Sequence, residues 1–209
     1  MWSLLISIMY ILFGALILYI LFKYSLKYNL SNNLINSLRN TFNTDNLCHY
    51  NKILDNLFIG NLFTARDKEF ITKNNIDIVL NITSEIPNYF YCDKNIKYYK
   101  LNISDTTNEY DQKIMMDNLH NFVKIIDKNL SENLINNTNH NILVHCYAGK
   151  SRSATVIAAY LIYKFNMTPD DAIKFIINKR SCAFNNGERL IFYDVLNKYY
   201  KLKISNFLN

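Results

Sequence analysis

The chain has 209 residues, half of them hydrophobic, and a formal net charge of +6 at pH 7. This length and apolar content allow a substantial core to be buried, which excludes an intrinsically disordered protein. The positive charge is scattered, without a dense Lys/Arg run interleaved with aromatic residues, so we expect no nucleic-acid partner.

The first part of the chain predicts a membrane anchor. Residues 2–22 contain no charged side chain, and a helix of about 20 such residues spans a hydrocarbon core of roughly 30 Å. Lys23 and Lys27 follow, so the positive-inside bias places the rest of the chain in the cytosol. A cleaved signal peptide is the alternative, but a basic n-region and a small-residue cleavage site are not clear. We expect a single-pass transmembrane anchor over residues 1–23, a juxtamembrane linker over 24–43 and a folded domain over 44–209.

Strand-like and helical runs alternate through that domain. Strands are predicted at 53–59, 76–82, 96–103 and 142–145; the second and fourth are nearly continuous apolar runs, as in strands buried on both faces. Helices are predicted at 64–73, 112–128, 153–165, 168–180 and 188–200, with a polar surface loop at 129–141. Thr168 and Pro169, followed by two acids, form a strong helix start. The pattern predicts an α/β domain whose helices flank a central mixed, largely parallel sheet.

The stretch from Val144 to Ser153 predicts an anion site. It follows a buried predicted strand and opens a buried predicted helix, so successive backbone N–H groups would present positive partial charge to a phosphate. Gly149 permits backbone geometry that a side chain would resist, and the planar fork of Arg152 can bind two phosphate oxygens. The predicted phosphate-binding loop comprises Tyr147, Ala148, Gly149, Lys150, Ser151 and Arg152.

Cys146 is the candidate nucleophile at the floor of this loop. Loop N–H groups, the helix dipole and nearby cations favour a thiolate over a thiol. The thiolate would attack phosphorus in line and form a phosphocysteine intermediate. His145 is expected to orient the loop and favour the thiolate. Ser153 is expected to donate a hydrogen bond to the sulfur and so ease its departure when water cleaves the intermediate.

A proton for the leaving oxygen must come from an acid on a separate loop. Asp105 is the best candidate, because it follows the predicted strand at 96–103 in a polar loop; Asp111 and Glu109 are weaker alternatives nearby. Loop amides and Arg152 already neutralise the phosphoryl charge, so we expect no metal and no other cofactor.

The sequence His-Cys-x-x-Gly-x-x-Arg-Ser at residues 145–153 resembles the signature of the protein tyrosine phosphatase superfamily. The fuller pattern, continuing to residues 159–161, is similar to the dual-specificity phosphatases. Similarity also covers residues 57–60, 80–83 and Asp105, and spans roughly residues 53–200. The resemblance implies a dual-specificity phosphatase-like catalytic domain over 44–209. In it Cys146 is the nucleophile, Arg152 the phosphate clamp and Asp105 the general acid.

The resemblance implies a phosphatase for phosphotyrosine and phosphoserine/threonine proteins, but two alternatives remain. Lys150 resembles the basic residue of phosphoinositide and phosphatidylglycerophosphate phosphatases, although Tyr147 stands where those enzymes often have a second basic residue. The first alternative is therefore a phospholipid phosphatase whose partners are lipid headgroups at a membrane. The second is a non-catalytic phosphate-binding module, a kind of domain that usually lacks the Cys, the Arg or the acid. Residues 182–189 also depart from the Ser-Pro-Asn-x-Gly-like stretch of many relatives.

The four cysteines are Cys48, Cys92, Cys146 and Cys182. They have neither metal-site spacing nor the density of a disulfide framework, so we expect reduced thiols. Cys92 or Cys182 could act as a resolving partner that traps an oxidised Cys146 as a disulfide. An ordinary core or surface thiol is the favoured interpretation for both.

Overall fold

The computed structural model of the protein describes residues 49–136, 138–184 and 191–207. The predicted membrane anchor over 1–23 and the predicted linker over 24–43 lie outside these ranges. Within them, no helix combines the length and the apolar character needed to cross a membrane.

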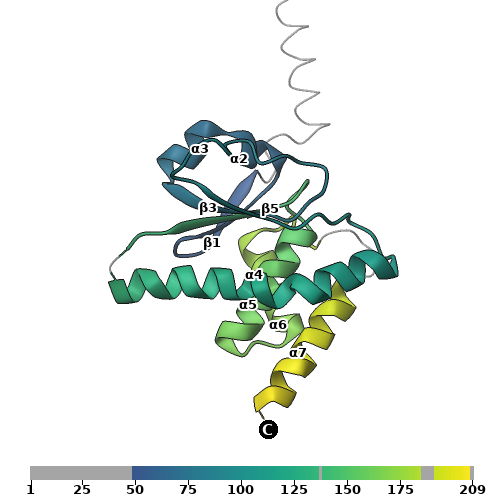
Figure 1. The fold of residues 1–209 in the computed structure, drawn as a ribbon. Helices are drawn as coiled ribbons and strands as arrows, with labels where there is room; N and C mark the ends of the chain where they lie inside the picture. The colour runs from purple at the N-terminus through teal and green to yellow at the C-terminus, as the bar shows by residue number, and fades with distance from the viewer. Residues whose placement is uncertain (1–48, 137, 185–190, 208–209) are drawn as a thin grey trace, which may run out of the picture. The chain divides into compact units, whose positions relative to one another are not determined.

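A five-stranded mixed sheet forms the centre of the domain (Figure 1). The strands lie in the order β1-β2-β5-β3-β4. Neighbours from β2 to β4 are parallel, and β1 pairs antiparallel with β2 at one edge. The predicted class, an α/β domain with a mixed and largely parallel sheet, is confirmed. The strand bounds are β1 Tyr50–Leu54, β2 Leu57–Gly60, β3 Ile76–Asn81, β4 Lys97–Lys100 and β5 Asn141–His145.

The single strand predicted at 53–59 is wrong, because this segment is a hairpin of β1 and β2. The chain reverses at Asp55 and Asn56. Asn56 has φ 64°, a left-handed conformation that asparagine tolerates better than most residues. Its side-chain amide donates to Asn141 Oδ1 over 2.7 Å, which ties the turn to the start of β5. In the sequence, the polar pair Asp55 and Asn56 is the signal for this turn. The apolar residues on both sides of the pair make residues 53–59 resemble one continuous strand.

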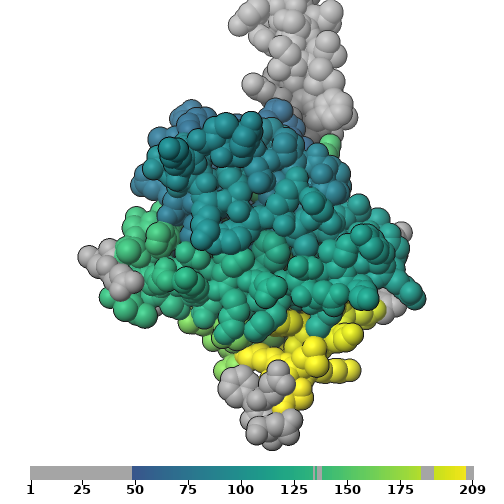
Figure 2. Space-filling model, viewed as in Figure 1, coloured from purple at the N-terminus to yellow at the C-terminus, as the bar shows by residue number. Residues whose placement is uncertain are grey.

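Helices cover both faces of the sheet (Figure 1). On one face lie the short helices α2 (Leu62–Arg66) and α3 (Lys68–Lys73). The predicted helix at 64–73 is divided at Asp67, whose carboxylate accepts from the N–H of Phe70 over 3.1 Å and caps α3. On the opposite face lie α4 (Glu109–Asn136), α5 (Arg152–Phe165), α6 (Pro169–Lys179) and α7 (Tyr193–Phe207). In the space-filling view α4 runs across the surface with α7 beside it (Figure 2).

Two of these helices differ from their predicted bounds. The loop predicted at 129–141 is wrong over most of its length, because α4 continues to Asn136. Leu130 packs on the core from this extension, and Asn129 donates to the carbonyl of Ile125 one turn earlier. α7 begins at Tyr193, later than predicted, and reaches Phe207. The predicted start of α6 is confirmed, since Thr168 Oγ1 accepts from the N–H of Asp171 over 3.2 Å.

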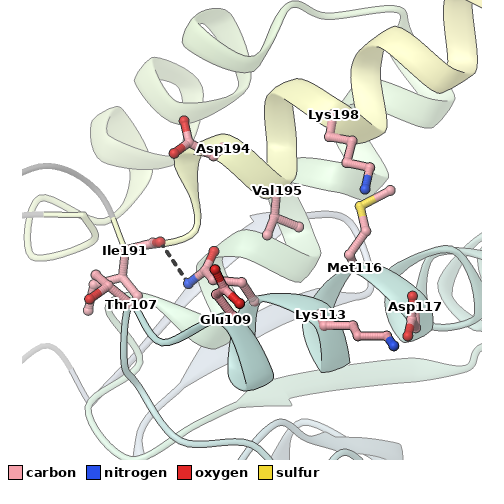
Figure 3. A pocket seen from close by; sticks show the side chains of 10 residues that line it. Thr107, Glu109, Lys113, Met116, Asp117, Ile191, Asp194, Val195 and Lys198 are labelled. Atoms are coloured by element: carbon pink, nitrogen blue, oxygen red, sulfur yellow. Dashed lines mark hydrogen bonds between the residues drawn. The ribbon is translucent and has the colours of Figure 1, made fainter.

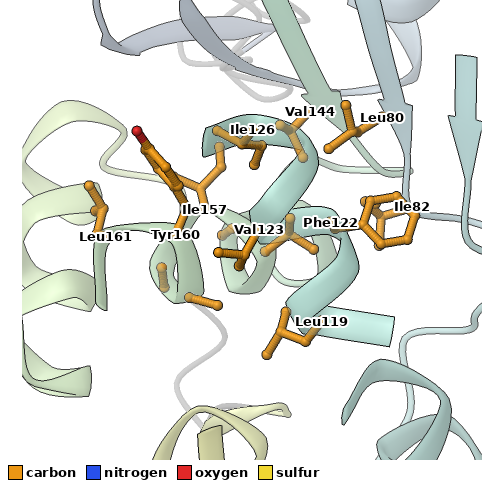
Figure 4. Packing of buried hydrophobic residues seen from close by; sticks show 14 of the residues in the cluster. Leu80, Ile82, Leu119, Phe122, Val123, Ile126, Val144, Ile157, Tyr160 and Leu161 are labelled. Carbon is orange, nitrogen blue, oxygen red and sulfur yellow. The ribbon is translucent and has the colours of Figure 1, made fainter. Parts of the chain in front are cut away.

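The main hydrophobic core lies between the sheet and the four longer helices (Figure 4). α5 is buried from Arg152 to Ile162 and stands at its centre. α4 contributes to this core the side chains of Leu119, Phe122, Val123 and Ile126. Removing one such side chain typically costs roughly 2–5 kcal/mol. The first turn of α5 is thereby held firmly against the end of β5. A smaller cluster on the other face includes Phe58, Phe70, Ile71, Ile76, Val79, Ile96 and Leu143.

Candidate active site

Three loops meet where the parallel strands end. Asn81 at the end of β3 is in register with His145 at the end of β5 and with Lys100 at the end of β4. Residues 146–151 follow β5, residues 82–86 follow β3 and residues 101–108 follow β4. Ligands of parallel α/β sheets bind beyond the carboxyl ends of the strands. The topology therefore brings the predicted phosphate loop and the predicted acid loop to one edge.

The predicted phosphate-binding loop has its carbonyl groups turned outward. Each carbonyl from Tyr147 to Ser151 accepts a hydrogen bond from outside the loop, with Leu62 N, Arg180 Nη2, Arg180 Nε, Phe184 N and Thr155 N as the donors in chain order. The C=O and N–H of a trans peptide unit point in opposite directions, so the N–H groups of these units face inward. Ser151 precedes α5 without a side-chain cap hydrogen bond, which leaves the first-turn amides to an anion. The loop is thus a nest for a phosphate-like group.

Arg180 stabilises this loop by donating hydrogen bonds to its outward-facing carbonyl groups, a role that the sequence did not reveal. The residue is fully buried, and its Nε donates to the carbonyl of Gly149 over 2.7 Å. Its Nη1 donates to Asn51 Oδ1 over 2.8 Å, which links the loop to β1. In the sequence Arg180 only marks the end of a predicted helix, and nothing in the local pattern shows that it is buried.

Cys146 lies at the floor of the nest. It is 1% exposed, and its Sγ accepts hydrogen bonds from Gly149 N at 3.2 Å and from Ser153 Oγ at 3.3 Å. Hydrogen bonds to a sulfur favour its anionic form. Gly149 has φ +67°, and a Cβ placed there would lie 2.5 Å from the carbonyl oxygen of Gly60. The close approach of the two backbones requires glycine.

His145 is buried directly before Cys146, the predicted nucleophile. Burial lowers its pKa from 6.5 to about 4, with further lowering from Lys100 and Arg152 and an opposing contribution from the Cys146 backbone. The imidazole is therefore neutral at pH 7. Any effect of His145 on the thiolate comes from a neutral ring rather than from a cation.

Arg152 and Asp105 are neighbours, as the predicted clamp and acid should be. Arg152 is 3% exposed, and its Nε lies 3.9 Å from Asp105 Oδ2. Among the described residues, this Nε and Asp105 Oδ1 are buried without a hydrogen-bond partner. Arg152 Nη1 donates to the carboxylate of Glu85 and to the carbonyl of Ile103. Glu85 was missed from the sequence, although it lies shortly after the strand predicted at 76–82.

Asp111 and Glu109, the alternative candidates for the general acid, occupy different positions from Asp105. Asp111 is 5% exposed and accepts from Ser104 N at 3.3 Å and from Thr106 Oγ1 at 2.5 Å. It therefore braces the loop that carries Asp105. Glu109 is exposed at the first turn of α4. Of the three acids, Asp105 is the one that contacts Arg152.

An open groove of about 560 Å³ lies between the first turns of α4 and α7 (Figure 3). Gln112 spans it by donating to the carbonyls of Thr106 and Ile191, each over 3.0 Å. The groove borders the acid loop at Thr107, but no residue of the phosphate-binding loop lines it. It is therefore distinct from the nest around Cys146.

A buried cysteine in an N–H nest, with an arginine from the following helix and an acid from a neighbouring loop, defines the class of cysteine-based phosphatase domains. A family model described as "Dual specificity phosphatase, catalytic domain" matches residues 57–201, well over half of the chain. The protein belongs to the dual specificity phosphatase family.

Similar proteins agree with this assignment. Human dual specificity protein phosphatase 9 is 34% identical over 134 residues, which are 62% of this chain and 31% of the relative. Mouse dual specificity protein phosphatase 13B is 32% identical over 149 residues, 69% of this chain and 71% of the relative. The chain thus spans less than a third of the first relative.

Solved structures show the same fold. Human DUSP28 superposes with a TM-score of 0.62 at 19% identity, covering 74% of this chain and 94% of the other. PTPMT1 in complex with PI(5)P has a TM-score of 0.60 at 25% identity, covering 76% of this chain and 99% of the other.

Proposed function

We propose that this protein is a cysteine-dependent phosphatase that hydrolyses phosphomonoesters on proteins carrying phosphotyrosine and phosphoserine/threonine. The observation that carries the proposal is the position of Cys146 Sγ, bonded by Gly149 N and Ser153 Oγ at the floor of an inward-facing N–H nest. The curated relatives are dual specificity protein phosphatases, which favours protein substrates.

In the first step the Cys146 thiolate attacks phosphorus. An S–P bond forms and the P–O bond to the leaving group breaks, while Asp105 gives its proton to the departing oxygen. The nest amides and Arg152 bind the equatorial phosphoryl oxygens, where negative charge must be stabilised. The buried Nε of Arg152, which has no partner among the described residues, is suited to one of these oxygens.

In the second step water attacks the phosphocysteine. Asp105, now a carboxylate, takes a proton from the water, the S–P bond breaks and the sulfur leaves as a thiolate. Ser153 Oγ, which already donates to the sulfur at 3.3 Å, stabilises the leaving thiolate. Phosphate is released and the nest returns to its starting state.

A phospholipid phosphatase is the second candidate function. Lys150 follows Gly149 in the loop and is partly exposed, and Tyr147 in the same loop is 54% exposed, so both side chains are accessible to a bulky substrate. A relative of similar fold was solved with PI(5)P, a phosphoinositide. The proposed membrane anchor over residues 1–23, with the catalytic domain facing the cytosol, would raise the local concentration of either substrate.

The experiment compares rates of the full chain in mild detergent, with a chelator present. One substrate is a peptide phosphorylated on Thr and Tyr; the others are short-chain phosphoinositides and phosphatidylglycerophosphate. Faster turnover of the peptide is expected. Preference for a lipid would make Lys150 a headgroup contact and replace the first proposal by the second. No turnover of these substrates or of a small aryl phosphate would identify a phosphate-binding module instead.

A further inference from the structure

Glu85 holds one edge of the Arg152 guanidinium. Arg152 Nη1 donates to Glu85 Oε2 over 2.7 Å and to Oε1 over 3.1 Å. The same Nη1 donates to the carbonyl of Ile103 over 3.0 Å. Nη1 carries two hydrogens, so its donor capacity is used by Glu85, in the β3–β4 connection, and by Ile103, in the loop after β4.

The other edge of the guanidinium is turned toward the site. Arg152 Nε is buried and has no hydrogen-bond partner among the described residues; Asp105 Oδ2 lies 3.9 Å from it. Nε and Nη2 carry parallel N–H groups, the pair that binds two oxygens of one phosphate. A buried guanidinium N–H without a partner is costly unless a ligand completes it.

Glu85 is itself held in place. Thr83 is fully buried; its Oγ1 donates to Glu85 Oε2 and accepts from the N–H of Glu85 over 2.9 Å. Ser84 N donates to the carbonyl of Ile103, the same acceptor that Arg152 uses. Burial raises the pKa of Glu85, but hydrogen bonds from Thr83 and Arg152 outweigh it and keep this pKa below its usual value. Glu85 is therefore a carboxylate at neutral pH.

We propose that Glu85 is a positioning residue for the phosphate clamp. It fixes Arg152 through Nη1, so that the Nε–Nη2 edge is presented to the substrate phosphate before binding. The inference rests on the proposed clamp role of Arg152. A flexible arginine would have to lose its side-chain freedom when phosphate binds, whereas one already held by Glu85 has lost it in folding.

Tungstate, a phosphate analogue, tests this without turnover. Its Kd would be measured by titration calorimetry on the full chain and on Glu85→Gln, which keeps the size of the side chain and removes its charge. We expect about tenfold weaker binding for Glu85→Gln. Glu69→Gln, an exposed acid in α3, is the matched control and should bind as the parent does. Because only binding is measured, the result stands even if no substrate is turned over.

Two further measurements separate positioning from other roles. In an Arg152→Lys background, Glu85→Gln should change the Kd by less than about twofold, because Glu85 acts through the arginine; an undiminished effect would overturn the proposal. Thermal unfolding shows whether the Kd changes without loss of the fold.

Two results for Glu85→Gln itself would contradict the inference. Tighter tungstate binding by this variant would mean that Glu85 competes with phosphate for Arg152, and an unchanged Kd would mean that Glu85 does not position the clamp. Either result would overturn the inference.

Discussion

Ser153 Oγ donates a hydrogen bond to Cys146 Sγ over 3.3 Å, and both residues are buried. Cys146 directly follows β5, whereas Ser153 lies in the first turn of α5. The two elements are fixed by the main core on either side of the loop. The hydroxyl is therefore held at the sulfur before any substrate binds, as the proposed step in which the sulfur becomes a leaving group requires.

Ser153→Ala should slow breakdown of the phosphocysteine more than its formation. The hydrogen bond stabilises the thiolate, which is the leaving group only in the second step. Rapid-mixing kinetics with an aryl phosphate should show a burst of phenol followed by a slow steady state, with kcat about tenfold to a hundredfold lower. Ser153→Thr, which retains the hydroxyl, is the matched comparison. Loss of the burst itself would place the role of Ser153 in the first step.

Cys146→Ser should abolish turnover while tungstate binding persists. The nest amides and Arg152, which bind the anion, are contributed by other residues, and serine is close in size to cysteine. Its hydroxyl is a far weaker nucleophile than a thiolate without an adjacent base. Activity would be assayed with an aryl phosphate and binding by calorimetry. Turnover that survived this change would exclude Cys146 as the nucleophile.

Asp105→Asn should affect substrates according to their leaving groups. A phenol activated by electron-withdrawing groups leaves without a proton, whereas an alkyl oxygen of phosphoserine needs one. We expect a loss of about 10²–10⁴-fold for phosphoserine peptide and a much smaller loss for an activated aryl phosphate. Asp111→Asn is the comparison, and it should reduce both rates to a similar extent because Asp111 braces the loop through Ser104 and Thr106. An equal loss on both substrates for Asp105→Asn would move the acid elsewhere.

The parts of this site that the sequence predicted are those encoded locally. Cys146 and Arg152 belong to one short loop between a strand and a helix, and the cap of α6 by Thr168 lies within one helical turn of its partner. Glu85 and Arg180 were missed because their partners are distant: Glu85 meets Arg152 across 67 positions and Arg180 meets Gly149 across 31. Their roles depend on how strands pack, which periodicity alone does not give.

His145→Gln should change how stability depends on pH. In the unfolded chain the imidazole takes up a proton near pH 6.5, but in the folded chain only near pH 4. The unfolded state binds more protons over this interval, so the free energy of unfolding falls as the pH is lowered from 6.5 toward 4. The contribution of His145 to this free energy is therefore complete above pH 6.5 and is lost toward pH 4. A shift of this size corresponds to about 3 kcal/mol. Urea unfolding should therefore show a parent-to-variant gap that narrows between pH 7 and pH 4.5. A gap that stayed constant over this pH range would contradict the depressed pKa of His145.

Gly149→Ala should both destabilise the domain and weaken anion binding. The residue has φ +67°, and the added Cβ would lie 2.5 Å from Gly60 O and 2.6 Å from Arg180 Nη2. The left-handed conformation alone costs a non-glycine residue about 1–2 kcal/mol, and Gly60 O is backbone that cannot move without shifting β2. Gly60→Ala is the matched comparison, because the three atoms nearest to the added Cβ there would be side-chain atoms of Leu143 and Thr64, at 3.0 Å. We expect a larger loss of unfolding free energy for Gly149→Ala in urea titrations, together with at least tenfold weaker tungstate binding. If both variants lost the same stability and Gly149→Ala kept its affinity, the close approach of Gly149 to Gly60 would not be what shapes the nest.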